Sequence, residues 1–280
     1  MSANLAENAR TFHRLHDEGR LLVLPNAWDA ASARIIEQAG ATAIATTSAG
    51  MAWSLGYADG EQLPVDELLA ACARIARVVS IPLSVDIERG YARTPAEVAD
   101  LTGLLIGTGV VGVNIEDGVV AGSSTLTPAA VLSERIAAVR ARADRAGLPL
   151  FINARTDTYF VPDGDPAGRV EETVRRARQY IEAGADGLFV PGIVELAQMA
   201  DIAQRIARPL NIYAGFAGVP PIDELRRAGV RRVSLGCGPL QSLLARTRRI
   251  AHEVLDQGSY AVMTGDMLSA AAINQLFTHR

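Results

Sequence analysis

Short apolar runs alternate with helical segments along the whole chain, and this alternation limits the possible folds more than any other feature. Each run is rich in β-branched or other apolar residues and ends in polar or small ones, which is typical of a buried parallel strand. The runs are Leu21–Pro25, Ala43–Thr47, Leu83–Asp86, Gly112–Glu116, Leu150–Ala154, Gly187–Pro191, Leu210–Ala214 and Arg232–Gly236. Helical spacing of apolar residues fills most of the intervals, for example at Glu67–Val78, Pro128–Ala146, Gly168–Ala183, Val194–Ala207 and Pro239–Leu255.

Eight strands with crossover helices in 280 residues predict an α/β protein built as a (β/α)8 TIM barrel. The spacing from strand to strand, roughly 20 to 40 residues, is what a strand-helix unit requires. An open doubly wound sheet is the alternative architecture. It is disfavoured because no Gly-x-Gly-x-x-Gly sequence follows the first run.

We expect one domain over residues 1–280, with a C-terminal helical extension over residues 258–280, because no linker or low-complexity stretch divides the chain. The extension contains a short apolar helix, expected at Met267–Phe277, that a closed barrel does not need. An extra amphipathic helix of this kind more often packs on a neighbouring subunit or caps a barrel than carries chemistry.

The composition fits a cytoplasmic enzyme with one large core, since 49% of the residues are hydrophobic and the net charge is −4. There is no basic tail for nucleic acid, and no apolar run approaches the ~20 residues that span a bilayer. Two cysteines are too few for a disulfide framework and fit a reducing compartment. We therefore expect neither a nucleic-acid nor a membrane partner.

The chain contains no lysine, because all 27 of its basic residues are arginine. Schiff-base aldolases, pyridoxal enzymes and Walker-type phosphate loops each require a lysine amine, so those chemistries are excluded. The four histidines fall in terminal helical segments, away from strand ends, which argues against a histidine-rich zinc site. Carboxylates, arginine, hydroxyls and a hard cation remain as catalytic tools.

Carboxylates gather at the ends of two consecutive predicted strands. Asp86 and Glu88 end one of them, and Glu116 and Asp117 end the next. Parallel strands place these ends at the same mouth, where the carboxylates repel one another unless a cation neutralises them. Oxygen-only ligation predicts Mg²⁺ or Mn²⁺ at this mouth.

Other polar residues at strand ends are candidates for binding an anionic substrate. Arg155 ends the fifth strand, and its planar guanidinium suits either bidentate binding of a carboxylate or neutralisation of Asp86 or Glu116. Thr47, Ser48 and Ala49 form a turn of small residues whose backbone N–H groups suit a second carboxylate. Asn211, inside a strand, either binds a ligand or fills a polar barrel layer.

The chain resembles the isocitrate lyase and phosphoenolpyruvate mutase superfamily along nearly its whole length. The order and spacing of several motifs carry the resemblance: Pro25-Asn-Ala-Trp-Asp-Ala30, Ser54-Leu-Gly-Tyr-Ala-Asp59, Asp86-Ile-Glu88, Asn114-Ile-Glu-Asp117, Asn153-Ala-Arg-Thr-Asp157, Ala183-Gly-Ala-Asp-Gly187, Leu210-Asn-Ile212 and Gly229–Gly236. The resemblance implies a (β/α)8 barrel whose last helices are exchanged between subunits. It therefore implies a homo-oligomer, usually a tetramer, with a dimer as the alternative.

The resemblance also implies roles for individual residues. Asp86 would bind Mg²⁺ directly, and Asp59, Glu88 and Glu116 would hold it through water. The turn at Thr47, Ser48 and Ala49 would grip the substrate carboxylate, with Arg155 and Asn211 completing the pocket. The chemistry of the superfamily makes or breaks a C–C or C–P bond next to a carboxylate through a metal-stabilised enolate.

Three positions depart from the pattern of the superfamily. Glu88 stands where the family has an aspartate, and Gly192 stands where lyases and mutases have a glutamate or histidine. The segment Asp117–Leu126 lacks the Lys-Lys/Arg-Cys-Gly-His sequence whose cysteine handles a proton in the lyases. Among the residues that might replace that cysteine, Tyr213 is the best candidate, because it lies on the same strand face as Asn211.

These observations leave three functions open. The first is a Mg²⁺-dependent lyase that acts on a small carboxylate through the enolate of a 2-oxo acid, with Arg155, Glu116 and Tyr213 in catalytic roles. The second is C–P chemistry like that of phosphoenolpyruvate mutase. The third is a barrel that binds a 2-oxo acid without turning it over. The carboxylate cluster favours an enzyme, and the loop without Lys, Cys or His favours the binder.

Overall fold

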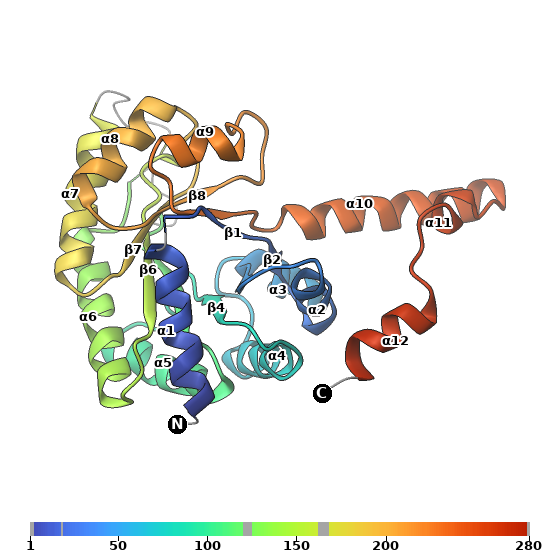
Figure 1. Cartoon of the computed structure of the whole chain (residues 1–280), viewed down its shortest axis with the longest axis horizontal. Helices are drawn as coiled ribbons and strands as arrows, with labels where there is room; N and C mark the ends of the chain where they lie inside the picture. Colours follow the sequence, from blue (N-terminus) through green and yellow to red (C-terminus); the bar gives the residue numbers. More distant parts are fainter. Residues whose placement is uncertain (1–2, 18, 120–124, 162–167, 279–280) are drawn as a thin grey trace.

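A computed structural model describes residues 3–17, 19–119, 125–161 and 168–278, and consists of parallel strands surrounded by helices (Figure 1). The strands are β1 (Leu22–Leu24), β2 (Asn26–Ala27), β3 (Ile44–Thr46), β4 (Leu83–Asp86), β5 (Gly112–Glu116), β6 (Phe151–Arg155), β7 (Gly187–Val190), β8 (Leu210–Tyr213) and β9 (Arg232–Ser234). The helices that follow these strands are α2 (Ala30–Gln38), α3 (Ser48–Ser54), α4 (Val65–Val78), α5 (Pro95–Thr108), α6 (Ala129–Arg145), α7 (Arg169–Glu182), α8 (Leu196–Ile206), α9 (Ile222–Arg227) and α10 (Gly238–His252). The helices named from the sequence agree with these bounds to within three residues.

The predicted TIM barrel is confirmed, with one change to its first strand. All strands are parallel and run in the order β1-β9-β8-β7-β6-β5-β4-β3-β2. The sequence predicts one first strand at Leu21–Pro25, but the structure has two short pieces, β1 and β2, separated by Pro25. Proline lacks the N–H group that a continuous strand pairing needs. As a result β1 pairs only with β9 and β2 pairs only with β3.

The side chain of Asn26 closes the ring at this break. Its Nδ2 donates to the Thr46 carbonyl at 2.7 Å, and its Oδ1 accepts from the backbone N–H groups of Leu235 and Gly236, both at 2.8 Å. One buried amide therefore ties the chain after β9 to the end of β3, where the backbone of the first strand does not reach. Asn26 is 3% exposed, so water does not replace these bonds.

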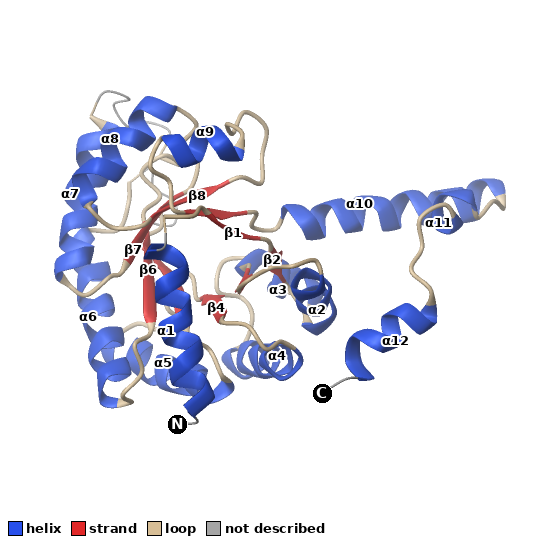
Figure 2. Cartoon of the chain, viewed as in Figure 1, coloured by secondary structure: helices blue, strands red, loops and turns tan. Residues whose placement is uncertain are grey.

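The helices cover the outside of the ring, and helix α1 (Ala3–Asp17) covers its N-terminal end (Figure 2). Phe12 and His16 of α1 pack on Phe151 at the start of β6, with ring centroids 5.4 and 3.9 Å away. His16 is almost completely buried, and burial lowers its pKa to about 3, so this ring stays neutral. The N-terminal end of the barrel is thus plugged, and its C-terminal end is left for chemistry.

The C-terminal part of the chain leaves the barrel. Helix α10 and the π-helical segment Glu253–Gln257 form an arm that projects from the barrel, and the chain then turns back through α11 (Ala261–Thr264) and α12 (Ala270–Thr278) (Figure 1). The helix expected at Met267–Phe277 is α12, which lies near α2 and accepts a hydrogen bond from Arg34 Nε at the Leu276 carbonyl, 2.8 Å away. The arm and tail expose large apolar side chains at Leu243, Leu244, Leu255, Val262, Met267, Leu268, Ile273 and Phe277.

Replacing Asn26 tests its role in closing the ring. We expect Asn26→Ala to lower the free energy of unfolding by about 2–4 kcal/mol, because it leaves two buried N–H groups and one carbonyl without partners. Urea denaturation measures this change. Asn8→Ala is the matched control, since Asn8 is partly exposed and its hydrogen bond to the Ser80 carbonyl is 3.5 Å long; its effect should stay within about 0.5 kcal/mol. Equal losses for the two variants would contradict the role assigned to Asn26.

Candidate active site

A small cavity lies at the C-terminal ends of the strands, where a TIM barrel places its active site. Its volume is about 150 Å³. Seven residues proposed from the sequence border it: Thr47, Ser48, Ala49, Asp59, Asp86, Arg155 and Tyr213. Three others, Glu88, Glu116 and Asn211, do not border it, and the functional roles of all ten residues stay predictions. The volume suits a small organic acid, and a nucleotide would be too large.

Asp86 ends β4, and backbone groups hold its carboxylate at the edge of the cavity. The Glu88 N–H donates to Asp86 Oδ1 at 3.1 Å, and the Ser48 N–H donates to the same carboxylate. The Asp86 N–H in turn donates to the Thr46 hydroxyl at 3.0 Å. Burial raises the pKa of Asp86, while Arg155 opposes that rise. A positive charge nearby would therefore stabilise its ionised form.

Glu88 faces the loop that carries Asp59. Both of its carboxylate oxygens accept from the backbone N–H of Glu61 at 2.9 Å, and the Tyr91 hydroxyl donates to Oε1 at the same distance. Its backbone has φ of 48°, a left-handed conformation that is strained for a residue other than glycine. Burial raises the pKa of Glu88 to about 7. In this structure Glu88 positions the loop on which Asp59 reaches the cavity.

Arg155 forms ion pairs with two carboxylates and also borders the cavity. Its Nε and Nη2 bind Asp157 in a bidentate pair at 2.6 and 3.0 Å, and its Nη1 lies 2.8 Å from Glu116 Oε2. The guanidinium also borders the cavity, between the rings of Phe160 and Phe189. Arg155 therefore neutralises Glu116 and is held rigidly where an anionic ligand would meet it.

The carboxyl groups around the mouth outnumber the positive charge that faces them. Burial is the main reason why the pKa of Glu116 rises to about 8, and the pKa of Asp86 and Glu88 also rises. Arg155 is the cation that lowers the pKa of both Asp86 and Glu116. Glu116 Oε2 faces Arg155 without an aligned hydrogen bond.

The donor set fits a hard divalent cation that keeps most of its water. Asp86 and Asp59 both border the cavity. Among the described residues, no three histidine, cysteine, aspartate or glutamate side chains converge as a ready set of direct ligands. Mg²⁺ commonly binds through one or two carboxylates while it retains several waters, so this arrangement suits Mg²⁺ or Mn²⁺ with Asp86 as the direct ligand.

The Tyr213 ring is held in a slot lined by two glycines. A Cβ atom at Gly215 or at Gly236 would overlap the ring, and Gly236 has φ of 55°, which glycine adopts without strain. The Tyr213 hydroxyl is hydrogen-bonded to the Cys237 thiol, and both residues border the cavity. Burial and the neighbouring Cys237 raise the pKa of Tyr213, so its hydroxyl keeps its proton at neutral pH.

Asp117 belongs to the cluster of acids in the sequence, but its side chain lies away from the cavity. Its carboxylate accepts hydrogen bonds from the Thr156 hydroxyl at 2.7 Å, the Asp157 N–H at 3.0 Å, Arg176 Nη1 at 3.0 Å and the Tyr180 hydroxyl at 2.8 Å. These partners lie after β6 and on α7. Asp117 therefore joins the ends of β5 and β6 and fixes the backbone on which Glu116 and Asp157 stand.

The sequence analysis did not assign roles to several residues of the cavity wall. They are Asn26, Asn114, Phe160, Phe189, Pro191, Ser234, Gly236 and Cys237. The sequence contained one signal for Asn114: it stands two residues before Glu116 and therefore lies on the same strand face. Positions 120–124, in the segment that departs from the lyase pattern, lie outside the described residues.

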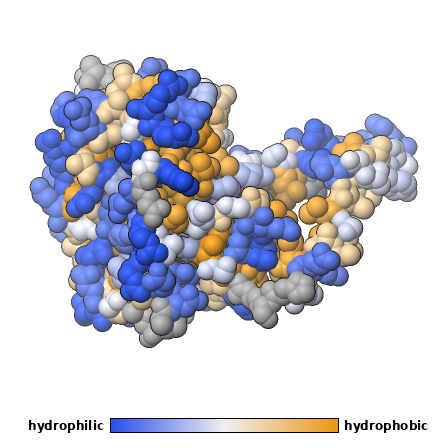
Figure 3. Space-filling model, viewed as in Figure 1, coloured by the Kyte–Doolittle hydropathy of each residue, from blue (hydrophilic) through white to orange (hydrophobic). Residues whose placement is uncertain are grey.

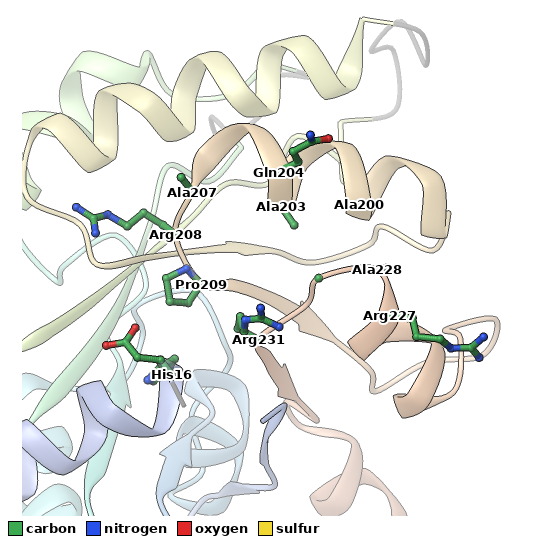
Figure 4. A pocket seen from close by; sticks show the side chains of 12 residues that line it. His16, Ala200, Ala203, Gln204, Ala207, Arg208, Pro209, Arg227, Ala228 and Arg231 are labelled. Atoms are coloured by element: carbon green, nitrogen blue, oxygen red, sulfur yellow. The ribbon is translucent and has the colours of Figure 1, made fainter. Parts of the chain in front are cut away.

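A larger groove of about 500 Å³ lies at the opposite end of the barrel, beside the ends of α1 and α8 (Figure 4). Three arginines border it, but Arg208 and Arg227 point away from each other and do not converge on one ligand. The N-terminal end of a TIM barrel usually serves stability. We therefore place the candidate site at the smaller cavity.

A protein-family model described as phosphoenolpyruvate phosphomutase matches residues 12–255. The chain belongs to this family. Family members include 2-methylisocitrate lyase of Escherichia coli, which is 34% identical over 228 residues that cover 79% of this chain and 74% of the relative. The predicted relationship to the phosphoenolpyruvate mutase and isocitrate lyase superfamily is thereby confirmed.

Two further comparisons support the same relationship. Oxaloacetate decarboxylase of Pseudomonas fluorescens is 26% identical over 283 aligned residues that cover 96% of this chain and 91% of the relative. A crystal structure of a protein from Burkholderia cenocepacia, described as a lyase or mutase, has a TM-score of 0.89 and 33% identity, and the match covers 99% of this chain and 98% of that one. No described helix of this chain is long and apolar enough to cross a membrane.

Removing the Asp117 carboxylate tests its structural role. We expect Asp117→Ala to lower the free energy of unfolding by about 3–5 kcal/mol, because it removes one buried charge partner of Arg176 and the shared acceptor of three further donors. Chemical denaturation measures the loss. Asp100→Ala, at an exposed site on α5, is the control and should change stability by less than about 0.5 kcal/mol. A loss as small as that of the control would show that the Asp117 network does not hold this region together.

Proposed function

We propose that the protein is a Mg²⁺- or Mn²⁺-dependent lyase that makes or breaks a C–C bond next to a carboxylate, through the enolate of a small 2-oxo acid related to pyruvate or oxaloacetate. One observation carries the proposal: a buried carboxylate, Asp86, and a rigidly held guanidinium, Arg155, border the same small cavity. The first suits a hard cation, and the second suits the carboxylate of an acid that the cation chelates.

The residues around the cavity have separate roles in the proposed reaction. When bound, the divalent cation supplies stabilisation of the negative charge that develops on the oxygens of a 2-oxo acid. Arg155 binds and orients the substrate carboxylate, with the backbone of Thr47, Ser48 and Ala49 at its other end. Asp86 would hold the cation directly, and Asp59, Glu88 and Glu116 would supply further carboxylates around it.

Tyr213 supplies the proton in this proposal. With oxaloacetate as substrate, cleavage of the bond between C3 and the leaving carboxylate releases CO₂ and leaves the electron pair on the pyruvate fragment as an enolate. The Tyr213 O–H then protonates C3 to give pyruvate, and the phenolate regains a proton from water. The Tyr213 hydroxyl is protonated at neutral pH and fixed by the two glycines, which suits a general acid. It stands in for the cysteine of the lyase loop that this chain lacks, and Asn211 supports the same wall of the site.

Relatives of this chain include enzymes of both C–C and C–P chemistry, since the matching family model is described as phosphoenolpyruvate phosphomutase. 2-Methylisocitrate lyase and oxaloacetate decarboxylase are both among the relatives of this chain, and both act on C–C bonds. The segment Asp117–Leu126 has neither the lysine of the phosphonate enzymes nor the cysteine of the lyases. A small substrate that needs little help from this loop, such as oxaloacetate or a substituted malate, is therefore the best candidate.

An assay of pyruvate release tests the reaction. We expect oxaloacetate or a substituted malate to yield pyruvate in the presence of Mg²⁺, above the rate with Mg²⁺ alone, and phosphonopyruvate to remain unchanged. EDTA should abolish release, and Asp86→Ala should lower kcat/KM by at least about 10³-fold because the direct ligand is lost. Asp100→Ala serves as the control with unchanged activity. Turnover of phosphonopyruvate would assign C–P chemistry instead, and oxalate binding without any turnover would identify a binder.

We further propose that the protein is a homo-oligomer in which the arm and tail pack on a neighbouring subunit. Apolar residues colour parts of the arm and of the tail beneath it orange (Figure 3). Leu255 and Met267 are 82% and 64% exposed in the single chain. A monomer seldom leaves so many large apolar side chains open to water, which supports a subunit contact at this place.

Truncation after Gly258 tests the role of the tail. We expect the shortened chain to sediment as a monomer or to aggregate, because removal of α11 and α12 leaves the apolar surface of the arm and of α2 uncovered. Analytical ultracentrifugation compares it with the full chain. An intact and soluble oligomer after truncation would exclude the tail from assembly.

A further inference from the structure

The barrel interior beneath the cavity contains several polar side chains where branched apolar residues usually fill such barrels. Ser84, Asn114, Asn153, Asn211 and Arg232 stand on β4, β5, β6, β8 and β9, and each is at most 4% exposed. Buried polar groups are costly unless they have partners, so their arrangement calls for a physical reason.

Asn114 lies at the centre of this group, and its acceptor oxygen is fully occupied. Oδ1 accepts from Asn153 Nδ2 at 2.9 Å and faces Arg232 Nη2 at 3.4 Å. Asp86 and Asn153 are its partners in register on the neighbouring strands. A flipped amide would turn its NH₂ group toward two other donors, so these contacts fix which way the amide points.

The other end of the Asn114 amide is directed to the cavity. Asn114 borders the cavity together with Asp86 and Arg155. Its Nδ2 has no acceptor among the described residues, yet it is not one of the enclosed polar atoms that lack a partner. This donor is therefore open to whatever occupies the cavity. A donor at this place attracts a carboxylate or carbonyl oxygen and does not ligate a cation.

We propose that Asn114 is a substrate-binding residue whose Nδ2–H group donates to an oxygen of the bound small acid, and that Asn153 and Arg232 are positioning residues that hold its amide in this orientation. The inference rests on the proposed function, in that the ligand is a carboxylic acid at the mouth of the barrel. It adds a side-chain donor to a cavity wall that also contains the turn at Thr47, Ser48 and Ala49.

Arg232 is the second donor that faces Asn114 Oδ1, and its charge also interacts with the buried carboxylate of Asp86. The side chain is completely buried, it has no ion pair among the described residues, and its Nε and Nη1 lack partners there. Burial lowers its pKa to about 9, so it still carries a charge at neutral pH. An apolar residue would avoid this cost. The contacts found for the guanidinium are the one with Asn114 and the face of the Phe12 ring, 5.9 Å from its centroid.

Calorimetric titration of oxalate in the presence of Mg²⁺ tests the binding role. We expect Asn114→Ala to raise the dissociation constant of oxalate about tenfold through loss of a hydrogen bond to a charged ligand. Asn114→Asp should raise it further, because it replaces the donor with a second acceptor of negative charge. Ser84→Ala is the matched control: Ser84 is equally buried, lies inside the barrel and does not border the cavity, so its affinity should equal that of the parent.

A double-mutant cycle separates positioning from a general structural effect. Asn153→Ala should weaken oxalate binding in the parent but leave it unchanged in the Asn114→Ala background, since its effect passes through Asn114. Arg232→Met also removes a charge that interacts with Asp86, so the Asn153 cycle carries the test of positioning. Losses that simply add would remove Asn153 and Arg232 from a positioning role.

Two outcomes distinguish this inference from the proposed function. Parent protein that binds oxalate and an Asn114→Ala variant that binds it equally well would overturn the inference and leave the proposed function standing. Parent protein that does not bind oxalate with Mg²⁺ would overturn both, because the cavity would then not be a site for a small acid.

Discussion

The closed ring of parallel strands is the constraint on which the other features depend. Closure brings the carboxyl ends of all strands to one mouth, and it is completed by the side chain of Asn26, where Pro25 interrupts the first strand. The same amide borders the cavity. The stability of the fold and the shape of the site therefore both depend on Asn26. Its hydrogen bonds hold the backbone turns at Thr47 and Gly236 in place.

Closure also creates an electrostatic problem that defines the chemistry of the site. Burial removes the carboxyl groups of Asp86, Glu88 and Glu116 from water and raises the pKa of each. Arg155 neutralises only part of their negative charge. The acidic side chains at the mouth of the barrel have different surroundings and therefore different roles. Asp86 stays at the cavity, Glu88 holds the loop of Asp59, and Asp117 is turned into a hydrogen-bonded network with Arg176. The charged groups that remain at the cavity suit a cation and an anionic ligand.

The fold was predictable because its signals are local. Runs of apolar residues, helical spacing and their alternation give the barrel, and the predicted helices lie close to those observed. The sequence predicts eight strands and the structure has nine, because the sequence does not show that the chain forms two short strands, β1 and β2, on either side of Pro25. The cavity was predictable in part, because Asp86, Arg155 and Tyr213 stand at strand ends. The directions taken by Glu88 and Asp117 were not, because each depends on partners from distant segments, Glu61 for one and Arg176 for the other.

The sequence by itself determined the barrel, the family, the absence of lysine chemistry and the acidic character of the mouth, since these follow from residue types and their order. Tertiary structure decided which polar groups share the cavity and which serve as supports. Asn114 and Asn211 are both asparagines inside strands, yet of the two only Asn114 borders the cavity. Asn211 Oδ1 instead accepts a hydrogen bond from the Ser234 hydroxyl. The physical reason is that the direction of a buried amide is set by the donors it meets across the barrel, and strands far apart in the chain supply them.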